Sequence, residues 1–342
     1  MAVTATVATQ PSTLNSQPSR TIMLLALRHR LEFLVFQLLV CAIDCLSPRA
    51  AARMAERMAW LVHYGLPRKL TRFAVARDNL RTAFGGRSTD AEIDRLVYRM
   101  WVHLFRTVAE IVQSTRKLHL HSYRQSIQFA DFTRTNDAVC SGRRVLMLGG
   151  HFGNWEIGPT LFGLWGFPMG IVARKMDNPH LHEWFRSYRE RTGHRLMLKN
   201  GGYDSMTALL EKGGSLGLLC DQDAGPRGLF VDFFGTPAST FKSIALLALE
   251  YDALIVVGYS IRLPDNFLED DSGWSRFEVG CEALIDPRSV TSNDPVREIT
   301  QQYTSALERA VCRAPEQYFW IHRRWKSEPR VRQRKAPERL AG

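Results

Sequence analysis

From about residue 143 onward, short apolar runs alternate with segments of helical character, and this alternation constrains the fold more than any other feature. The apolar runs lie at Val145–Leu148, Ile171–Ala173, Arg195–Leu198, Leu216–Cys220, Leu229–Phe233 and Leu254–Ile261. The helical candidates between them lie at Asn154–Trp165, Pro179–Thr192, Asp204–Lys212 and Ser239–Glu250. Such alternation predicts an α/β fold, namely a mixed, mainly parallel sheet flanked by helices, with antiparallel strands where connections are short.

The first 115 residues have a different, helical pattern. Ser47 and Pro48 are typical of a helix N-terminus, and that helix is expected to stop near Gly65. A second helix should begin at Thr89, which forms a capping box with Glu92, and apolar residues recur at helical spacing after it. We therefore predict a helical layer that precedes the α/β region.

A chain of 342 residues can form one large domain or two medium ones, and length alone leaves both open. No internal repeat is visible, so we predict one α/β domain prefaced by helices. The first twenty residues carry one charge, Arg20, and lack the apolar core of a secretory signal. The predicted divisions are a disordered arm at 1–20, a single domain at 21–328 with a helical layer at 21–115 and an α/β core at 143–328, and a basic tail at 329–342.

Composition disfavours several classes of protein. With 45% hydrophobic and 23% charged residues, the composition is typical of a globular chain and argues against wholesale disorder, a collagen-like repeat and a multi-span membrane protein. The cysteines are scattered without a CxxC pair, so we expect reduced thiols in a cytosolic compartment rather than disulfides or a zinc cluster. They are Cys41, Cys45, Cys140, Cys220, Cys281 and Cys312.

The segment Leu31–Leu46 bears on membrane association. A spanning helix needs roughly 20 mostly apolar residues, and this segment is shorter and contains Glu32, Gln37 and Asp44. It suits a helix that lies on a membrane, or a marginal anchor. A buried core helix of a soluble protein is the alternative.

Positive charge is concentrated near the C-terminal end of the chain. The net charge is +11, and the last twenty residues hold eight basic and two acidic residues, a surplus of +6. Such a tail beside an apolar helix favours an anionic membrane surface, where each Lys or Arg contributes about 1 kcal/mol. We do not expect nucleic acid as a partner, because no helix carries a stripe of Arg and Lys with interleaved aromatic residues. A tail that is merely solvated is the alternative.

Polar residues follow four of the apolar runs. The first residues of this kind are His151 (after Gly149 and Gly150), Arg174, Asp221 and Arg262. Because open α/β sheets bind ligands outside the carboxyl ends of their strands, we expect these side chains to converge at one edge. Scattered caps on the protein surface are the alternative.

His151 lies in a glycine-rich segment between an apolar run and a helix. Gly150 and Gly153 let the backbone turn tightly and approach a substrate, and Asn154 can cap the helix. Glu156, in the first turn of that helix, is expected to hydrogen-bond one imidazole nitrogen of His151. Such a dyad can deprotonate a hydroxyl, a general-base effect of roughly 10²- to 10⁴-fold. A structural histidine that caps a turn is the alternative.

Two other patterns predict less. Gly213–Gly217 fits G-x-S-x-G, but a nucleophile elbow follows a strand and opens a helix, whereas this order is reversed here. The cluster of His180, His182, His194 and Glu183 lacks the spacing of metal ligands, so we expect no metal site.

Ordered motifs run through the chain from about residue 22 to 328. They are Asn79-Leu80 with Phe84, the block Gly150–Glu156, Arg174 with Asn178-Pro179, Arg189 ahead of Gly193, Asp221-Gln222-Asp223, Phe233–Thr240 and Pro315–Lys326. Together they resemble the bacterial lipid A biosynthesis acyltransferases, which include lauroyl and myristoyl transferases and the related phosphatidylinositol mannoside acyltransferases. The resemblance implies a fold like that of the glycerolipid acyltransferases.

The resemblance also implies roles for single residues. His151 and Glu156 match the family's catalytic His-x4-Asp/Glu dyad. Arg189, or with less support Arg174, corresponds to a basic residue near the reacting acyl group. Asp221 corresponds to an acidic residue of the site.

Attack on a thioester also requires donors for the oxyanion that develops on the carbonyl oxygen. Losing one such donor typically costs about 2.7–4 kcal/mol. Arg189 and the backbone between Gly150 and Gly153 are the candidates, and Asn154 belongs to the same expected substrate-binding group.

The implied reaction moves a fatty acyl chain from acyl carrier protein or acyl-CoA to a hydroxyl of a membrane glycolipid such as a lipid A precursor. It would take place at the cytoplasmic face of the bacterial inner membrane, with the protein peripheral or marginally anchored. The acyl donor is a co-substrate, and no cofactor or metal is expected. A catalytically silent lipid-binding or membrane-adaptor protein on the same fold is the alternative.

Overall fold

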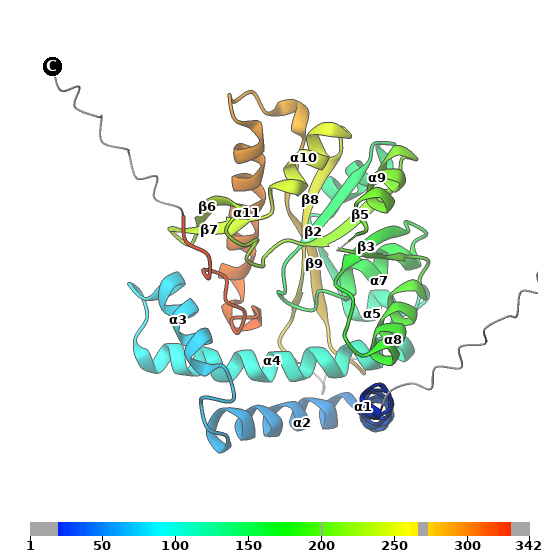
Figure 1. Ribbon diagram of the computed structural model, residues 1–342, viewed down its shortest axis with the longest axis vertical. Coiled ribbons are helices and arrows are strands. Elements are labelled where there is room, and N and C mark those ends of the chain that lie inside the picture. The colour runs from blue at the N-terminus through cyan, green and yellow to red at the C-terminus, as the bar shows by residue number, and fades with distance from the viewer. Residues whose placement is uncertain (1–19, 200, 266–272, 330–342) are drawn as a thin grey trace, which may run out of the picture.

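The computed structural model describes residues 20–199, 201–265 and 273–329 (Figure 1). Almost all of the arm predicted at 1–20 and of the basic tail predicted at 329–342 lies outside these residues. The first helix, α1 (Arg20–Asp44), begins at the last residue assigned to the arm.

A seven-stranded sheet forms the centre of the molecule. Its strand order is β1-β9-β8-β2-β5-β3-β4, and every neighbouring pair is parallel except β8 with β9. The mixed, mainly parallel sheet flanked by helices is therefore confirmed. The strands are β1 (Ile127–Ala130), β2 (Val145–Gly149), β3 (Met169–Ala173), β4 (Arg195–Leu198), β5 (Ser215–Leu219), β8 (Leu254–Arg262) and β9 (Phe277–Ile285).

Two further strands lie outside this sheet. The run predicted at Leu229–Phe233 forms β6, but it pairs with β7 (Thr236–Thr240) in a separate antiparallel hairpin. Phe234 and Gly235 both have positive φ, the backbone that a two-residue hairpin turn requires. The helix predicted from Ser239 consequently begins only after β7, at Lys242.

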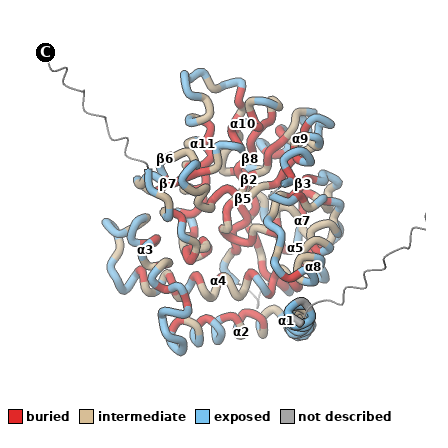
Figure 2. Tube along the Cα trace, viewed as in Figure 1, coloured by how far each residue is buried: buried red, intermediate tan, exposed pale blue. Residues whose placement is uncertain are grey.

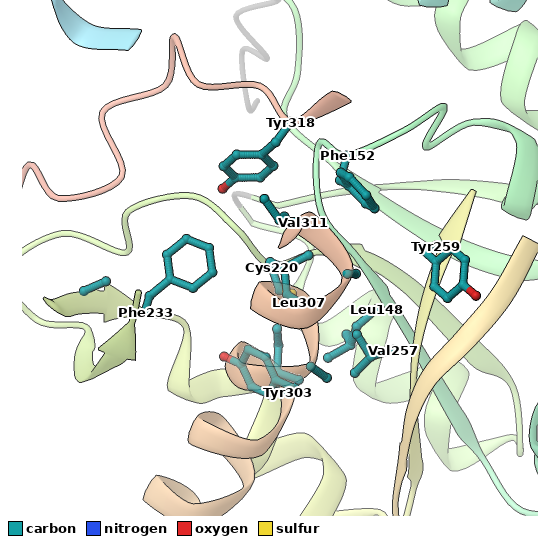
Figure 3. Packing of buried hydrophobic residues seen from close by; sticks show 14 of the residues in the cluster. Leu148, Phe152, Cys220, Phe233, Val257, Tyr259, Tyr303, Leu307, Val311 and Tyr318 are labelled. Carbon is teal, nitrogen blue, oxygen red and sulfur yellow. The ribbon is translucent and has the colours of Figure 1, made fainter. Parts of the chain in front are cut away.

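Helices cover both faces of the sheet, and alternate residues of β2 face the two layers. Leu146 and Leu148 belong to the core with α10 and α11, and Figure 3 shows Leu148 beside Tyr303 and Leu307 of α11. Val145 packs with α6 on the opposite face, where α7 also lies. These helices are α6 (Thr133–Cys140), α7 (Ile157–Leu164), α10 (Lys242–Glu250) and α11 (Pro295–Arg313), and the shorter or peripheral ones are α5 (Tyr123–Ser126), α8 (Pro179–Glu190) and α9 (Tyr203–Glu211).

Four helices form the layer before the sheet: α1, α2 (Pro48–Trp60), α3 (Phe73–Phe84) and α4 (Asp90–Lys117). In Figure 1, α4 crosses below the sheet, α2 lies along its outer side, and α1 is seen end-on. The Ser47 cap of α2 and the capping box of Thr89 and Glu92 on α4 are both present, as predicted. A π-helical turn, Leu61–Gly65, follows α2.

Among the residues that the structure describes, no helix combines the length and the apolar character that crossing a membrane requires.

Candidate active site

Two neighbouring strands bring His151 and Asp221 together. β2 and β5 run parallel and in register to their carboxyl ends, so the residues that follow them lie side by side. The backbone N–H of His151 donates to Asp221 Oδ2 over 2.8 Å, and Nδ1 of the imidazole is 2.9 Å from Oδ1. A Cβ atom at Gly150 would lie 2.7 Å from Leu307, so glycine permits this approach. The convergence predicted at the strand ends is correct for His151 and Asp221.

The contact shifts the pKa values of both groups. Burial by itself lowers the pKa of His151, but the charge of Asp221 and the hydrogen bond to it outweigh burial, and the net pKa is raised. Burial tends to raise the pKa of Asp221, whereas the imidazole lowers it below its ordinary value. Asp221 is thus an anion that accepts a hydrogen bond from Nδ1–H, which leaves Nε2 as the nitrogen that can take a proton.

The hydrogen bond expected between Glu156 and the imidazole is not formed, because Asp221 holds Nδ1 and Glu156 binds Arg189. Arg189 of α8 donates from Nη2 to Oε1 over 2.6 Å and from Nε to Oε2 over 3.2 Å. α7 begins at Ile157 rather than near Asn154, so Glu156 is its N-cap residue. Spacing along the sequence does not reveal which strand lies beside β2, and the expected contact fails for that reason. A catalytic role for Glu156 stays a prediction.

The other two arginines at the strand ends have different surroundings. Arg174 is exposed, lines the cavity described below, and lies 3.8 Å from Asp177. Arg262 is buried and does not line that cavity. The expectation that Arg262 joins His151 is therefore wrong, because a carboxylate of α4, Glu110, binds its guanidinium.

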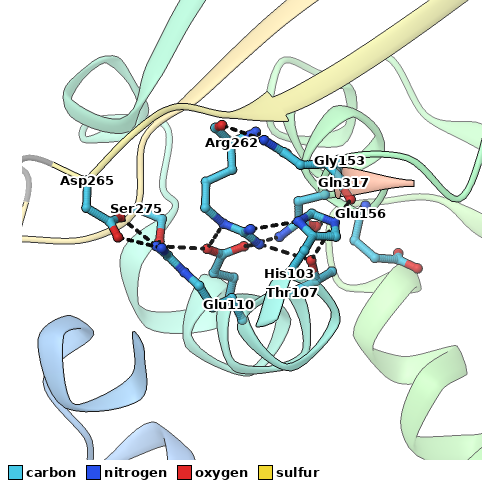
Figure 4. A network of polar contacts seen from close by, with 11 residues as sticks. His103, Thr107, Glu110, Gly153, Glu156, Arg262, Asp265, Ser275 and Gln317 are labelled. Atoms are coloured by element: carbon cyan, nitrogen blue, oxygen red, sulfur yellow. Dashed lines mark hydrogen bonds and ion pairs between the residues drawn. The ribbon is translucent and has the colours of Figure 1, made fainter. Parts of the chain in front are cut away.

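A buried polar network ties α4 to the loop at 150–156 (Figure 4). The Arg262 guanidinium donates to the two carboxylate oxygens of Glu110 over 2.5 and 2.7 Å. Oε2 of Glu110 also accepts a hydrogen bond from the Asn154 side-chain amide over 3.1 Å. Asn154 in turn accepts the backbone N–H of Glu156 over 3.3 Å. The site loop is thus held by a residue of the helical layer.

His103 of α4 makes the second connection to this loop. Its Nδ1 accepts a hydrogen bond from Arg262 over 2.7 Å, so Nε2 carries the proton and donates to the Gly153 carbonyl over 3.1 Å. Burial and the charge of Arg262 lower the pKa of His103 well below its ordinary value, which keeps this imidazole neutral. Gly153 has a φ of +57°, and a Cβ atom there would lie 2.1 Å from the Ser260 carbonyl oxygen, so only glycine fits.

Residues 315–327 lie across the same loop. The backbone N–H of Phe319 donates to the His151 carbonyl over 3.0 Å, and its ring centroid lies 5.9 Å from that of the imidazole. Arg324 anchors the segment, because its buried guanidinium donates to the Ser239 carbonyl over 2.6 Å and to Thr240 Oγ1 over 2.7 Å. Arg324 was counted in the basic surplus of +6, but it is not available to a membrane surface.

A cavity of about 340 Å³ extends from His151 between the sheet and helices α6 and α7. Three glycines of adjacent strands line it and leave its space free of side chains: Gly149, Gly217 and Gly258. Deeper along the strands its lining is apolar, with residues such as Phe132, Phe162, Met169, Ile171 and Val256. At the carboxyl edge of the sheet it is polar, with Arg174, Arg189, Lys199 and Gln222.

Lys199 is a residue of this cavity that sequence reasoning missed. It follows β4 directly, as Arg174 follows β3, and the register places Ala173 opposite Leu198. The rule that found Arg174 therefore applies equally to Lys199, and the run Arg195–Leu198 was the available signal.

His194, one of the histidines that lack the spacing of metal ligands, has other partners. His194 is buried, accepts the Met169 backbone N–H over 3.0 Å and lies 2.6 Å from the Pro159 carbonyl oxygen. No three His, Cys, Asp or Glu side chains in the described part of the chain are grouped so that they would hold a metal ion. Ser215 begins β5 after a helix, so it is not a nucleophile elbow.

The chain is similar to proteins of known activity. The lipid A biosynthesis lauroyltransferase of Escherichia coli is 28% identical over 195 residues, which are 56% of this chain and 60% of that protein. The phosphatidylinositol mannoside acyltransferase of Mycolicibacterium smegmatis is 23% identical over 206 residues, 59% and 63% of the two chains. The matched region thus spans less than two thirds of the length of these relatives.

The crystal structure of the 1-acyl-sn-glycerophosphate acyltransferase PlsC from Thermotoga maritima covers 72% of this chain and 97% of its own, with 13% identity and a TM-score of 0.34, which is too low to bear on the fold. The family model for bacterial lipid A biosynthesis acyltransferases matches residues 17–327 of this chain. That range includes His151, Asp221, Glu156 and Arg189 together with the cavity. The chain therefore belongs to the bacterial lipid A biosynthesis acyltransferase family.

Proposed function

We propose that this protein transfers a fatty acyl group from a thioester to a hydroxyl of a membrane lipid. The observation that carries the proposal is the position of His151, whose imidazole is held by Asp221 at the polar end of an otherwise apolar cavity. An acyl chain suits the apolar part, and a general base is needed where the thioester would lie. Membership of the family supports the same reaction.

In the proposed reaction, Nε2 of His151 takes the proton of the acceptor hydroxyl while that oxygen forms a bond to the thioester carbonyl carbon. The carbon–sulfur bond then breaks, and the leaving thiolate takes the proton back from the imidazolium. Asp221 stabilises the imidazolium by its charge and fixes the ring through Nδ1.

The oxyanion needs a hydrogen-bond donor, and most backbone N–H groups of the loop at 150–156 that were expected to supply one already have an acceptor. The N–H groups of His151, Gly153 and Asn154 already donate to Asp221, to the Gln317 carbonyl and to the Ser260 carbonyl. Arg189 lines the cavity and binds Glu156 through Nε and Nη2. We therefore assign the oxyanion to Nη1 of Arg189, and Glu156 then acts by holding Arg189 rather than by holding the imidazole.

The donor we propose is acyl carrier protein or acyl-CoA as a co-substrate, without a further cofactor, and the acceptor is a glycolipid such as a lipid A precursor. We place the reaction at the cytoplasmic face of the inner membrane. All six cysteines are free, which is consistent with a reducing compartment.

Membrane association is part of the proposal and rests on α1. Its exposed large apolar residues are Met23, Leu24, Leu25, Leu27, Leu31, Leu34, Val35, Leu38 and Leu39, each between 49% and 67% exposed. The opposite side of the helix packs on α8, where Phe36 contacts Trp184 and Phe185. A helix with one docked side and an apolar remainder suits the lipid surface of the membrane.

The test is acyl transfer by the purified protein from acyl carrier protein or acyl-CoA to extracted membrane lipids, followed by mass spectrometry. His151→Ala should reduce the rate by about 10²- to 10⁴-fold while vesicle binding is unchanged. If wild type transfers nothing from either donor yet binds vesicles, the catalytically silent alternative is correct. Full activity of His151→Ala would exclude this histidine as the base.

The pH dependence tests the partner of the imidazole. Since the base must be deprotonated and Asp221 raises its pKa, the rate should rise with pH through a midpoint above the ordinary imidazole pKa. Asp221→Asn should move that midpoint to lower pH, and Glu156→Gln should move it less. A larger shift for Glu156→Gln would return Glu156 to the role of base partner.

The cavity itself is tested by filling it. A Cβ atom at Gly258 would meet only the Gly280 and Leu148 carbonyl oxygens, at 3.7 and 3.9 Å, so a side chain there extends into the cavity without a backbone clash. Gly258→Val should shift the preferred donor toward shorter acyl chains. Gly86→Val is the matched control, because Gly86 is exposed and a Cβ atom there meets nothing within 4 Å.

A further inference from the structure

A second group of exposed apolar residues lies at the far end of α2 from α1. It comprises Met58, Trp60, Leu61, Tyr64, Leu66 and Leu70, from the end of α2, the π-helical turn and the segment that follows. We call it the Trp60 patch. Trp60 is 57% exposed, Tyr64 58% and Leu70 73%. Such a concentration of large apolar residues at one tip requires an occupant.

The patch shares a face with α1. Figures 1 and 2 place α1 and α2 below α4, on the side away from the sheet, with the buried side of α2 toward α4. α2 has 13 residues, which at 1.5 Å per residue separate the patch from α1 by about 20 Å. α1 runs across the direction of α2. The two ends of α1 and the Trp60 patch therefore do not lie on one line, and together they can rest on a flat surface.

The charges around the patch point to the chemistry of its occupant. Between residues 53 and 72 the chain carries five basic residues and one acidic one. Arg57, Lys69 and Arg72 are exposed, whereas Arg68 is paired with Asp94. Trp and Tyr are enriched where an apolar phase meets water, and nearby Lys and Arg favour anionic headgroups.

We propose that the Trp60 patch binds an anionic bilayer and, together with α1, fixes how the domain lies on the membrane. This rests on the membrane association proposed above. α1 alone leaves the domain free to roll about the helix axis, whereas a second contact about 20 Å to one side prevents that rotation. The orientation of the cavity relative to the lipid surface is then fixed.

The test is co-sedimentation of the full chain with vesicles of phosphatidylglycerol and phosphatidylethanolamine in equal parts. The variant Leu61→Ser/Tyr64→Ser should bind roughly tenfold more weakly than wild type. The matched control is Leu246→Ser/Tyr203→Ser, which removes a leucine and a tyrosine of similar exposure, 45% and 54%, from α10 and α9 at the opposite end (Figure 1). The control should bind like wild type, and thermal melts verify that both variants fold.

A charge variant separates headgroup attraction from apolar contact. Lys69→Ala/Arg72→Ala should weaken binding to the anionic vesicles by about fivefold for each charge removed and leave binding to phosphatidylcholine vesicles unchanged. If wild type binds no vesicles, the proposed membrane association itself is wrong. If wild type binds and the patch variant binds equally, only the Trp60 patch is excluded. If the patch variant instead breaks up a wild-type dimer in gel filtration, a second copy is the occupant and the proposal is overturned.

Discussion

α1 and α4 belong to the same helical layer, but α4 buries polar side chains that hydropathy would leave in water, whereas α1 exposes apolar ones. α4 buries polar groups, namely His103, Thr107, Glu110, Gln113 and Ser114, whereas α1 leaves most of its leucines exposed. The difference is in their partners. Each of these buried groups of α4 meets a donor or acceptor from another element, whereas α1 contacts α4 and α8 on one side and leaves its leucines without such a neighbour. Hydropathy gives the preference of a side chain for water or an apolar environment. Whether that side chain is buried in the fold also depends on whether a neighbouring element supplies a matching partner.

The largest effect is expected from removing the α4 carboxylate that binds Arg262. Glu110→Ala leaves Arg262 buried without a counter-charge, which should lower the free energy of unfolding by about 3–5 kcal/mol. Gln113→Ala is the control, since Gln113 lies on the same helix but binds only the Ile43 and Leu46 carbonyls and should cost about 1 kcal/mol. Urea unfolding measures both. Equal losses of unfolding free energy would mean that the ion pair of Glu110 with Arg262 contributes no more to stability than the hydrogen bonds of the Gln113 amide.

Glu110→Gln sharpens the same comparison at the site. The amide keeps the volume but cannot accept from Arg262 and Asn154 as the carboxylate does, so the loop at 150–156 loses one support. Small displacements of reacting groups can lower rates by about 10²-fold, and we expect kcat to fall while KM changes little. Gln113→Ala should keep full activity. An unchanged kcat in a folded Glu110→Gln would show that the loop needs no support from α4.

A medium effect should follow from pH. The folded state keeps His103 neutral because its pKa is lowered, whereas the unfolded chain binds a proton there below about pH 6.5. The unfolded state then binds more protons, so stability is lost as pH falls below that value. His103→Gln should show a shallower loss of stability between pH 7 and pH 5, measured by urea unfolding at each pH. Identical slopes would mean that His103 is protonated in the folded state.

The smallest effect on stability is expected for α1. Leu34→Ser/Leu38→Ser replaces two exposed leucines and should change the free energy of unfolding in lipid-free buffer by less than about 0.5 kcal/mol each. Leu80, which is fully buried, provides the contrast, because Leu80→Ser should destabilise the fold by several times as much. Vesicle binding by the α1 variant should nevertheless fall. Strong destabilisation would mean that these leucines pack against the protein in solution.

Sequence patterning predicted the central strands and the meeting of His151 with Asp221, because both follow from apolar runs and from the residue after each run. It missed β9, whose run Phe277–Ile285 is interrupted by charged and small residues. It also predicted Glu156 as the partner of the His151 imidazole. The true partner, Asp221, follows β5, and the order β8-β2-β5 that places β5 beside β2 is a property of the assembled sheet. The prediction that Arg262 lies at the site is wrong for a related reason. Its partner Glu110 is 152 residues away in the sequence, and no local pattern indicates that contact.

The segment at 315–327 has a consequence for synthesis of the protein. The loop that carries His151 is synthesised early, but the His151 carbonyl can accept the N–H of Phe319 only after residue 319 has been made. The segment is anchored later still, when Arg324 binds Ser239 and Thr240. A nascent chain that already contains His151, Asp221 and Arg189 therefore lacks the assembled site. Because domains fold as units while the chain is made, the contacts around His151 are complete only after residue 324 has left the ribosome.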